Sequence, residues 1–140
     1  MYDNERPPPP TQFDRWLTGT AGDELTLVHA LYEWYKLLHT DITKYPKTER
    51  YALGEILKTK TLTLIEGSWE ANTLALPERL FLLDRLQRTL DLTRLLVRLA
   101  YDIGIYHLDG YVYRQRKLQN IGNMLGGWRR TTRKRIGLDP

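Results

Sequence analysis

Apolar side chains recur every three or four residues along most of this chain, and this spacing constrains the fold more than any other feature. The first stretch runs through Leu25, Val28, Tyr32, Tyr35, His39 and Ile42, with Leu31, Trp34 and Leu38 widening it. Such a period places apolar side chains on one face of an α-helix, and that face must be buried against other helices. No strand-like alternation competes with it. We therefore expect an all-α protein.

Helix-breaking residues divide the pattern into four segments, which we expect at about residues 23–43, 48–73, 77–103 and 111–130. Pro46 ends the first segment, because the residue before a proline disfavours the α region. Pro77 suits the first turn of the third, where its missing N–H costs nothing. Gly104 and Asp109-Gly110 bracket the last turn. Four helices joined by short loops predict an up-down-up-down four-helix bundle.

The domain organisation follows from the same pattern, since 140 residues suffice for one domain only. We expect a flexible Pro-rich arm over residues 1–23, the four-helix bundle over 24–130 and a basic tail over 131–140. The arm contains four consecutive prolines, which favour polyproline II, and a Thr/Gly-rich joint just before the first helix.

Composition argues against most enzyme classes. The chain has no cysteine and a single serine, and its three histidines lie in no metal-binding or catalytic motif. We therefore expect no catalytic residues, no metal and no cofactor. No strictly apolar run exceeds four residues, which excludes a membrane-spanning helix, and no secretory signal is visible. A cytoplasmic protein is the expectation.

Positive charge is concentrated at the C-terminal end. The chain carries a formal charge of +4, yet residues 114–140 contain eight Lys and Arg against one acid, so the remainder is net acidic. The basic residues of this segment are Arg114, Arg116, Lys117, Arg129, Arg130, Arg133, Lys134 and Arg135. Basic residues also complement the negative end of the helix dipole at a helix C-terminus, but eight are more than this role requires. A segregated positive segment predicts binding to nucleic acid or another polyanion.

The third segment has two apolar sectors where a helix of a lone bundle needs one. Leu83, Leu86, Leu90, Val97 and Tyr101 form the first, and Phe81, Leu92, Leu96, Leu99 and Ile103 form the second. A deeply packed central helix would explain both, but a four-helix bundle does not provide one. We therefore expect the second sector to be an oligomer interface.

A line of alternating charges runs between these sectors, including Asp84 with Arg88 and Arg98 with Asp102 at a spacing of four residues. The simpler interpretation, which we favour, is a solvated face that neutralises itself. The alternative is that Arg79, Arg94 and Arg98 contact phosphates or line an assembly channel.

Two motifs resemble known protein families. Residues 45–54, YPKTERYALG, resemble the F-P-K-[ST]-E-R-[FY]-x-L-G segment of a four-helix-bundle superfamily that includes proteins encoded in intervening sequences of ribosomal RNA genes. Residues 121–129, IGNMLGGWR, are similar to the I-G-x-M-L-G-G-W-x-K ending of one branch. That branch is the accessory variability determinant (Avd) proteins of diversity-generating retroelements. The motif positions are Pro46, Lys47, Glu49, Arg50, Leu53, Gly54, Gly122, Leu125, Gly126, Gly127 and Trp128.

The resemblance implies a function without catalysis. Avd proteins assemble as pentameric barrels of four-helix protomers, bind nucleic acid through basic surfaces and partner the retroelement reverse transcriptase. By this resemblance we expect a ring-shaped homo-oligomer, a pentamer as in the family. Its expected partners are reverse transcriptase and template RNA, with DNA as the alternative nucleic acid. The alternative is an oligomeric scaffold that binds only protein.

Overall fold

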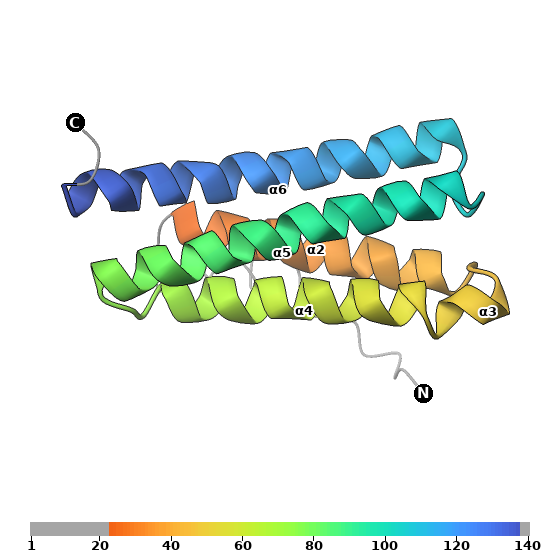
Figure 1. Ribbon diagram of the computed structural model, residues 1–140, viewed down its shortest axis with the longest axis horizontal. Coiled ribbons are helices and arrows are strands. Elements are labelled where there is room, and N and C mark those ends of the chain that lie inside the picture. Colours follow the sequence, from red (N-terminus) through yellow and green to blue (C-terminus); the bar gives the residue numbers. More distant parts are fainter. Residues whose placement is uncertain (1–22, 138–140) are drawn as a thin grey trace, which may run out of the picture.

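The computed structural model describes residues 23–137, which form an all-α, up-down-up-down bundle (Figure 1). Its long helices are α2 (Asp23–Ile42), α4 (Leu53–Ala71), α5 (Leu76–Asp102) and α6 (Leu108–Arg135). Each packs against the next, and α6 returns to α2 to close the bundle. The predicted Pro-rich arm lies outside the described residues except for Asp23, which begins α2.

The core forms because each helix buries one apolar face along the bundle axis. Residues with almost no exposed surface come from every long helix: Leu27, Leu31, Trp34 and Leu38 from α2, Leu57 and Leu64 from α4, Leu83, Leu90 and Val97 from α5, and Leu118 and Leu125 from α6. Their spacing of three, four or seven residues is the expected bundle seam. The predicted fold class is therefore confirmed.

The second predicted helix is interrupted, and its first turn is a separate short helix, α3 (Lys47–Arg50). Ala52 has φ −112° and ψ −89°, outside the helical range, before α4 begins at Leu53. Gly54 explains the tight geometry here, because a Cβ atom at this position would lie 3.0 Å from Ile42 Cγ2. The expectation of one continuous helix was wrong because α4 starts in close contact with the end of α2.

Gly67 fixes the contact between α4 and α5. A Cβ atom at this position would overlap the side chain of Leu86, which is itself buried. A side chain at this position would therefore force Leu86, and the packing around it, to shift. The contact sets the level of α4 relative to α5 along the bundle axis.

The fourth helix ends at Arg135, five residues beyond its expected end, and is followed by Gly137 with φ +77°. A glycine with positive φ after the last turn is a common helix terminator. Thr132 is buried on this extension, and its hydroxyl donates to the carbonyl of Trp128 at 2.8 Å. The predicted tail over 131–140 is therefore helical as far as Arg135.

Candidate functional site

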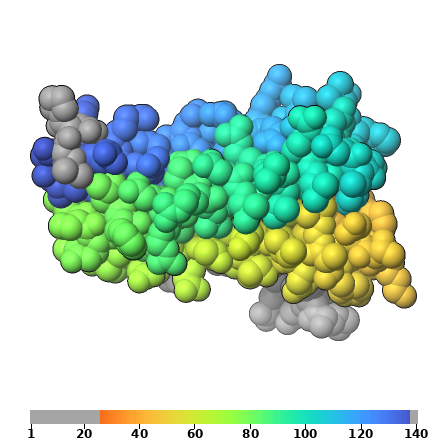
Figure 2. Space-filling view, in the orientation of Figure 1, coloured from red at the N-terminus to blue at the C-terminus, as the bar shows by residue number. Residues whose placement is uncertain are grey.

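The outward face of α6 is the most basic surface of the described chain. No acidic residue occurs between Arg116 and Arg135. At about 100° per residue, Arg116, Arg130 and Lys134 point away from the buried side chains of α6, and all three are exposed. The face is completed by exposed amides of Gln119, Asn120 and Asn123. Figure 2 shows α6, in blue, along one long edge of the molecule beside α5.

Gly126 and Gly127 lie within this face. A Cβ atom at either position would meet only the guanidinium of Arg130, at 3.5 and 3.8 Å. Packing inside the bundle therefore does not require glycine here, although each glycine costs a helix about 1 kcal/mol relative to alanine. The pair instead lets the Arg130 guanidinium lie close to the helix backbone.

A basic groove between α5 and α6 adjoins this face. Its charged lining consists of Arg94, Arg98 and Arg116, and Tyr111, Gln115 and Gln119 add polar groups. Arg98 pairs with Asp102 at 2.9 Å on the exposed surface. Arg94 and Arg116 form no ion pair with any described residue, so their charges remain uncompensated by a carboxylate.

Three of the predicted phosphate-binding arginines instead stabilise the bundle. Arg79 donates to the carbonyls of Ala71 and Leu74 at 2.9 and 3.0 Å, where α4 ends. Arg129 pairs with Asp84 at 2.8 Å across α5 and α6. Arg79 and Arg129, together with Arg114, therefore make internal contacts, and the proposed nucleic-acid surface does not depend on them.

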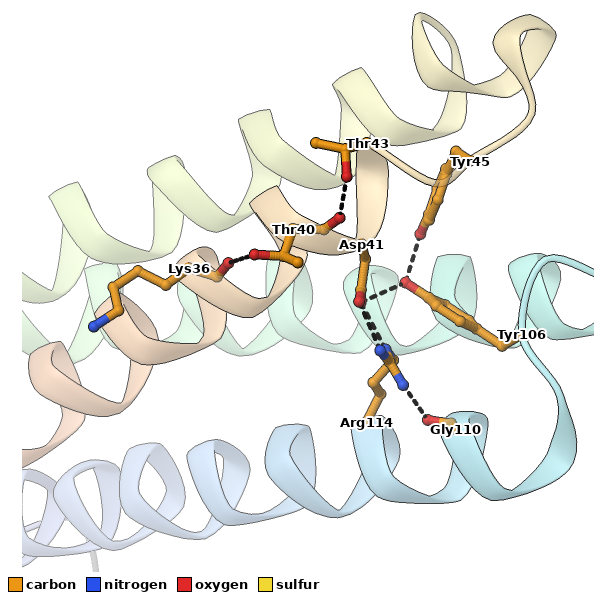
Figure 3. A network of polar contacts seen from close by, with 8 residues as sticks. All are labelled: Lys36, Thr40, Asp41, Thr43, Tyr45, Tyr106, Gly110 and Arg114. Atoms are coloured by element: carbon orange, nitrogen blue, oxygen red, sulfur yellow. Dashed lines mark hydrogen bonds and ion pairs between the residues drawn. The ribbon is translucent and has the colours of Figure 1, made fainter. Parts of the chain in front are cut away.

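Arg114 belongs to a buried polar network at one end of the bundle (Figure 3). Its guanidinium donates two hydrogen bonds of 2.6 Å to the Asp41 carboxylate and stacks on the Tyr106 ring at 4.5 Å. The Tyr106 hydroxyl donates to Asp41 at 3.0 Å and shares a 2.6 Å hydrogen bond with Tyr45. The network ties α2 to α6 and to both adjoining loops, which accounts for Arg114 without a ligand.

Burial raises the pKa of Tyr45 from 10 to about 12, and it raises the pKa of Tyr106 as well. Because each tyrosine holds its proton more tightly in the folded chain, its full contribution to stability is present below pH 10. Above pH 10 the contribution is lost, because the tyrosine of the unfolded chain ionises before that of the folded chain. Between pH 10 and 11 the free energy of unfolding should fall by about 1 kcal/mol for each such tyrosine. Urea titrations at several pH values measure this fall.

Tyr45→Phe supplies the control for this prediction, because other tyrosines and lysines also titrate in the same range. The variant should lose less stability than the parent over that interval, by about 1 kcal/mol. Parallel losses in the two proteins would contradict the assignment.

The charged line on α5 pairs differently from the expectation. Asp84 binds Arg129 of α6 instead of Arg88, and Asp91 accepts a hydrogen bond from Gln87. Only the Arg98–Asp102 pair forms as predicted. Arg88 is therefore left without an ion pair among the described residues.

The second apolar sector of α5 is largely solvent-exposed. Phe81, Leu92, Leu99 and Ile103 expose between 37% and 69% of their surface. Leu96 is the exception, because it packs against the core as a half-buried residue. Leu95, which lies outside the predicted sector, is 63% exposed and completes the stripe. This unpartnered apolar stripe is typical of an interaction surface.

The motif residues divide between structure and surface. Leu53, Gly54, Leu125 and Trp128 are buried, and Gly122 makes an ordinary contact with Leu90. Arg50 donates to the carbonyls of Thr43 and Tyr45, which holds the turn before α3. The exposed motif positions are Pro46 and Lys47. The first motif therefore shapes the α2–α4 connection.

No group of three or more potential ligand residues in the described chain could hold a metal ion. None of its helices is long and apolar enough to cross a membrane.

Comparison with protein families gives a match to the model described as bAvd-like, over residues 26–132. Neither the curated proteins nor the solved structures gave a match. The matched range covers all four long helices except the first turn of α2 and the last turn of α6.

Proposed function

This chain belongs to the bAvd-like family, and on that premise we propose that it is a non-catalytic accessory protein of a diversity-generating retroelement. It binds the template RNA through the outward face of α6 and partners the reverse transcriptase as a homo-oligomer. The absence of acids between Arg116 and Arg135 carries the RNA assignment. Lysine and arginine on one face neutralise phosphates and release counterions.

The dimensions of the α6 face suit a polyanion. Arg116 and Arg130 are fourteen residues apart, which corresponds to about 21 Å along a helix at 1.5 Å per residue. Lys134 extends the row by one further turn, and the groove lined by Arg94 and Arg98 lies beside it. Arginine also binds phosphate through a planar, bidentate fork. A homo-oligomer would multiply these contacts and raise the avidity for one RNA.

The test is a titration of a labelled structured RNA at several salt concentrations. For the parent protein, the logarithm of the affinity should fall linearly with the logarithm of salt. The triple variant Arg116→Glu/Arg130→Glu/Lys134→Glu should bind at least about 100-fold more weakly, and its salt slope should be smaller by about 2, since each lost contact removes about 0.7.

The matched control is Lys44→Glu/Lys47→Glu/Lys58→Glu, which makes the same change in net charge away from α6. It should bind RNA more tightly than the α6 variant by at least about tenfold. Equal losses in the two variants would show that net charge alone matters and would overturn the α6 assignment.

The exposed apolar stripe on α5 favours a second candidate, an oligomeric scaffold that binds only protein. That function predicts a multimer without measurable RNA affinity even at low salt. The same titration distinguishes the two candidates. Co-purification of the reverse transcriptase with this chain, retained in the α6 variant, would separate protein binding from RNA binding.

A further inference from the structure

The outward face of α5 combines apolar side chains with positive charge. Phe81, Arg85, Arg88, Leu92, Leu95 and Leu99 follow one another at intervals of three or four residues, and all are exposed. On a helix this spacing places them in a single row. Arg85 and Arg88 form no ion pair with any residue in the described range. The row is therefore an apolar surface with a basic section whose arginines are free of ion pairs within the described range.

The outward face of α4 has the opposite charge. Glu55, Thr59, Leu62, Glu66 and Glu70 are exposed and follow a similar spacing. Lys58 and Lys60, the lysines of α4, lie to either side of this row on the helix. Glu66 and Glu70 form no ion pair within the part of the chain that the structure describes. The α4 face is therefore an acidic surface with an exposed leucine.

These two faces match in position along the bundle axis as well as in charge. Gly67 lies against Leu86, and α4 runs antiparallel to α5 beside it (Figure 1). At 1.5 Å per residue, the acidic pair and the basic pair lie within about 5 Å of that contact along the bundle axis. Both pairs also line one groove between the helices. Counted from the same contact, Leu62 and Leu92 lie at nearly the same position along the bundle axis.

We propose that the outward face of α5 docks on the outward face of α4 of a second copy of this chain. A rotation about an axis parallel to the bundle keeps each residue at its own level. Arg85 and Arg88 of one copy then meet Glu66 and Glu70 of the next, and Leu92 meets Leu62. The inference rests on the self-association in the proposed function and names the two surfaces that form it.

Such a contact is heterologous, because two different faces of the chain meet. Each copy therefore uses its α5 face for one neighbour and its α4 face for the other. Repeating the contact closes a ring when the rotation between neighbouring copies is a whole fraction of a full turn. An isologous contact of α5 with α5 would instead bring arginines of the two copies together, which charge repulsion disfavours. The basic face of α6 takes no part in the contact and stays available to RNA.

Charge exchange tests the pairing, with mass measured by light scattering on the full chain at micromolar concentration. Arg85→Glu/Arg88→Glu gives two acidic faces and Glu66→Arg/Glu70→Arg gives two basic faces, so each variant alone should be monomeric. Mixing them should restore association, because each acidic face then meets a basic one; the two variants must alternate, so a closed ring of the mixture needs an even number of copies. The fourfold variant carrying all four changes should regain the mass of the parent by itself.

Circular dichroism of each variant checks that its helices are retained. An unchanged multimer in Glu66→Arg/Glu70→Arg, or no recovery in both the mixture and the fourfold variant, would overturn the α4–α5 pairing. A monomeric parent protein would overturn self-association as well. RNA affinity, measured on the same samples, reports separately on the α6 face, so failure of the pairing and failure of RNA binding are distinguishable.

Discussion

Replacing Arg114 with leucine should lower the free energy of unfolding by about 3–5 kcal/mol, because it leaves the Asp41 carboxylate buried without its cation. Asp41 is 8% exposed and Arg114 is 15% exposed, so the pair is largely shielded from water. The Tyr106 hydroxyl would remain the only described donor to the carboxylate, at 3.0 Å. Urea denaturation followed by far-UV circular dichroism measures the loss.

The double variant Asp41→Asn/Arg114→Leu is the control for this prediction. Asparagine keeps a carbonyl oxygen for the Tyr106 hydroxyl but carries no charge, so much of the lost stability should return. A single Arg114→Leu variant within 1 kcal/mol of the parent would contradict a buried pair. RNA affinity of the folded single variant should stay unchanged, since the network already occupies this guanidinium.

Trp34→Ala should cost about 3–5 kcal/mol of unfolding free energy, the second large effect. Trp34 is among the largest fully buried side chains and lies in the centre of the α2 seam. Its indole N–H donates to the Thr61 hydroxyl at 3.1 Å, and that hydroxyl donates to the Leu57 carbonyl at 2.9 Å. The substitution removes a bulky side chain and one buried hydrogen bond from the α2–α4 contact. Urea denaturation measures the cost.

Two further variants separate the contributions at Trp34. Trp34→Phe keeps most of the apolar volume but loses the N–H donor, and it should cost clearly less than alanine because Thr61 retains its bond to Leu57. Tyr113→Ala removes an exposed aromatic on α6 that lies 4.8 Å from the Lys117 ammonium. It should change stability by less than about 1 kcal/mol. Similar costs for Trp34→Ala and Tyr113→Ala would contradict the placement of Trp34 in the core.

Local periodicity was sufficient to predict the fold. The apolar spacing in the third segment placed Leu83, Leu90 and Val97 on a buried face, and all three are buried. The predicted exposure of Phe81, Leu92 and Leu99 follows from the same helical period. Both results depend on neighbours three or four positions apart, which sequence fully specifies.

Pairing across helices could not be predicted in this way. Arg114 was assigned to nucleic acid from its place in a basic segment, yet its partner Asp41 lies 73 residues away. One signal was present, since Asp41 follows Leu38 by three residues and so falls on the apolar face of α2. An acid at such a position predicts a buried cationic partner but does not identify it.

Spacing along single segments and the breaks between them predicted the four long helices, their antiparallel order and the acid-free face of α6. Which arginines remain available on the surface, and how α4 is set against α5, depends on contacts between segments far apart in the chain. Those features arise where helices meet, and there a single close contact, such as that of Gly67 with Leu86, fixes the relative positions of residues far apart in the chain.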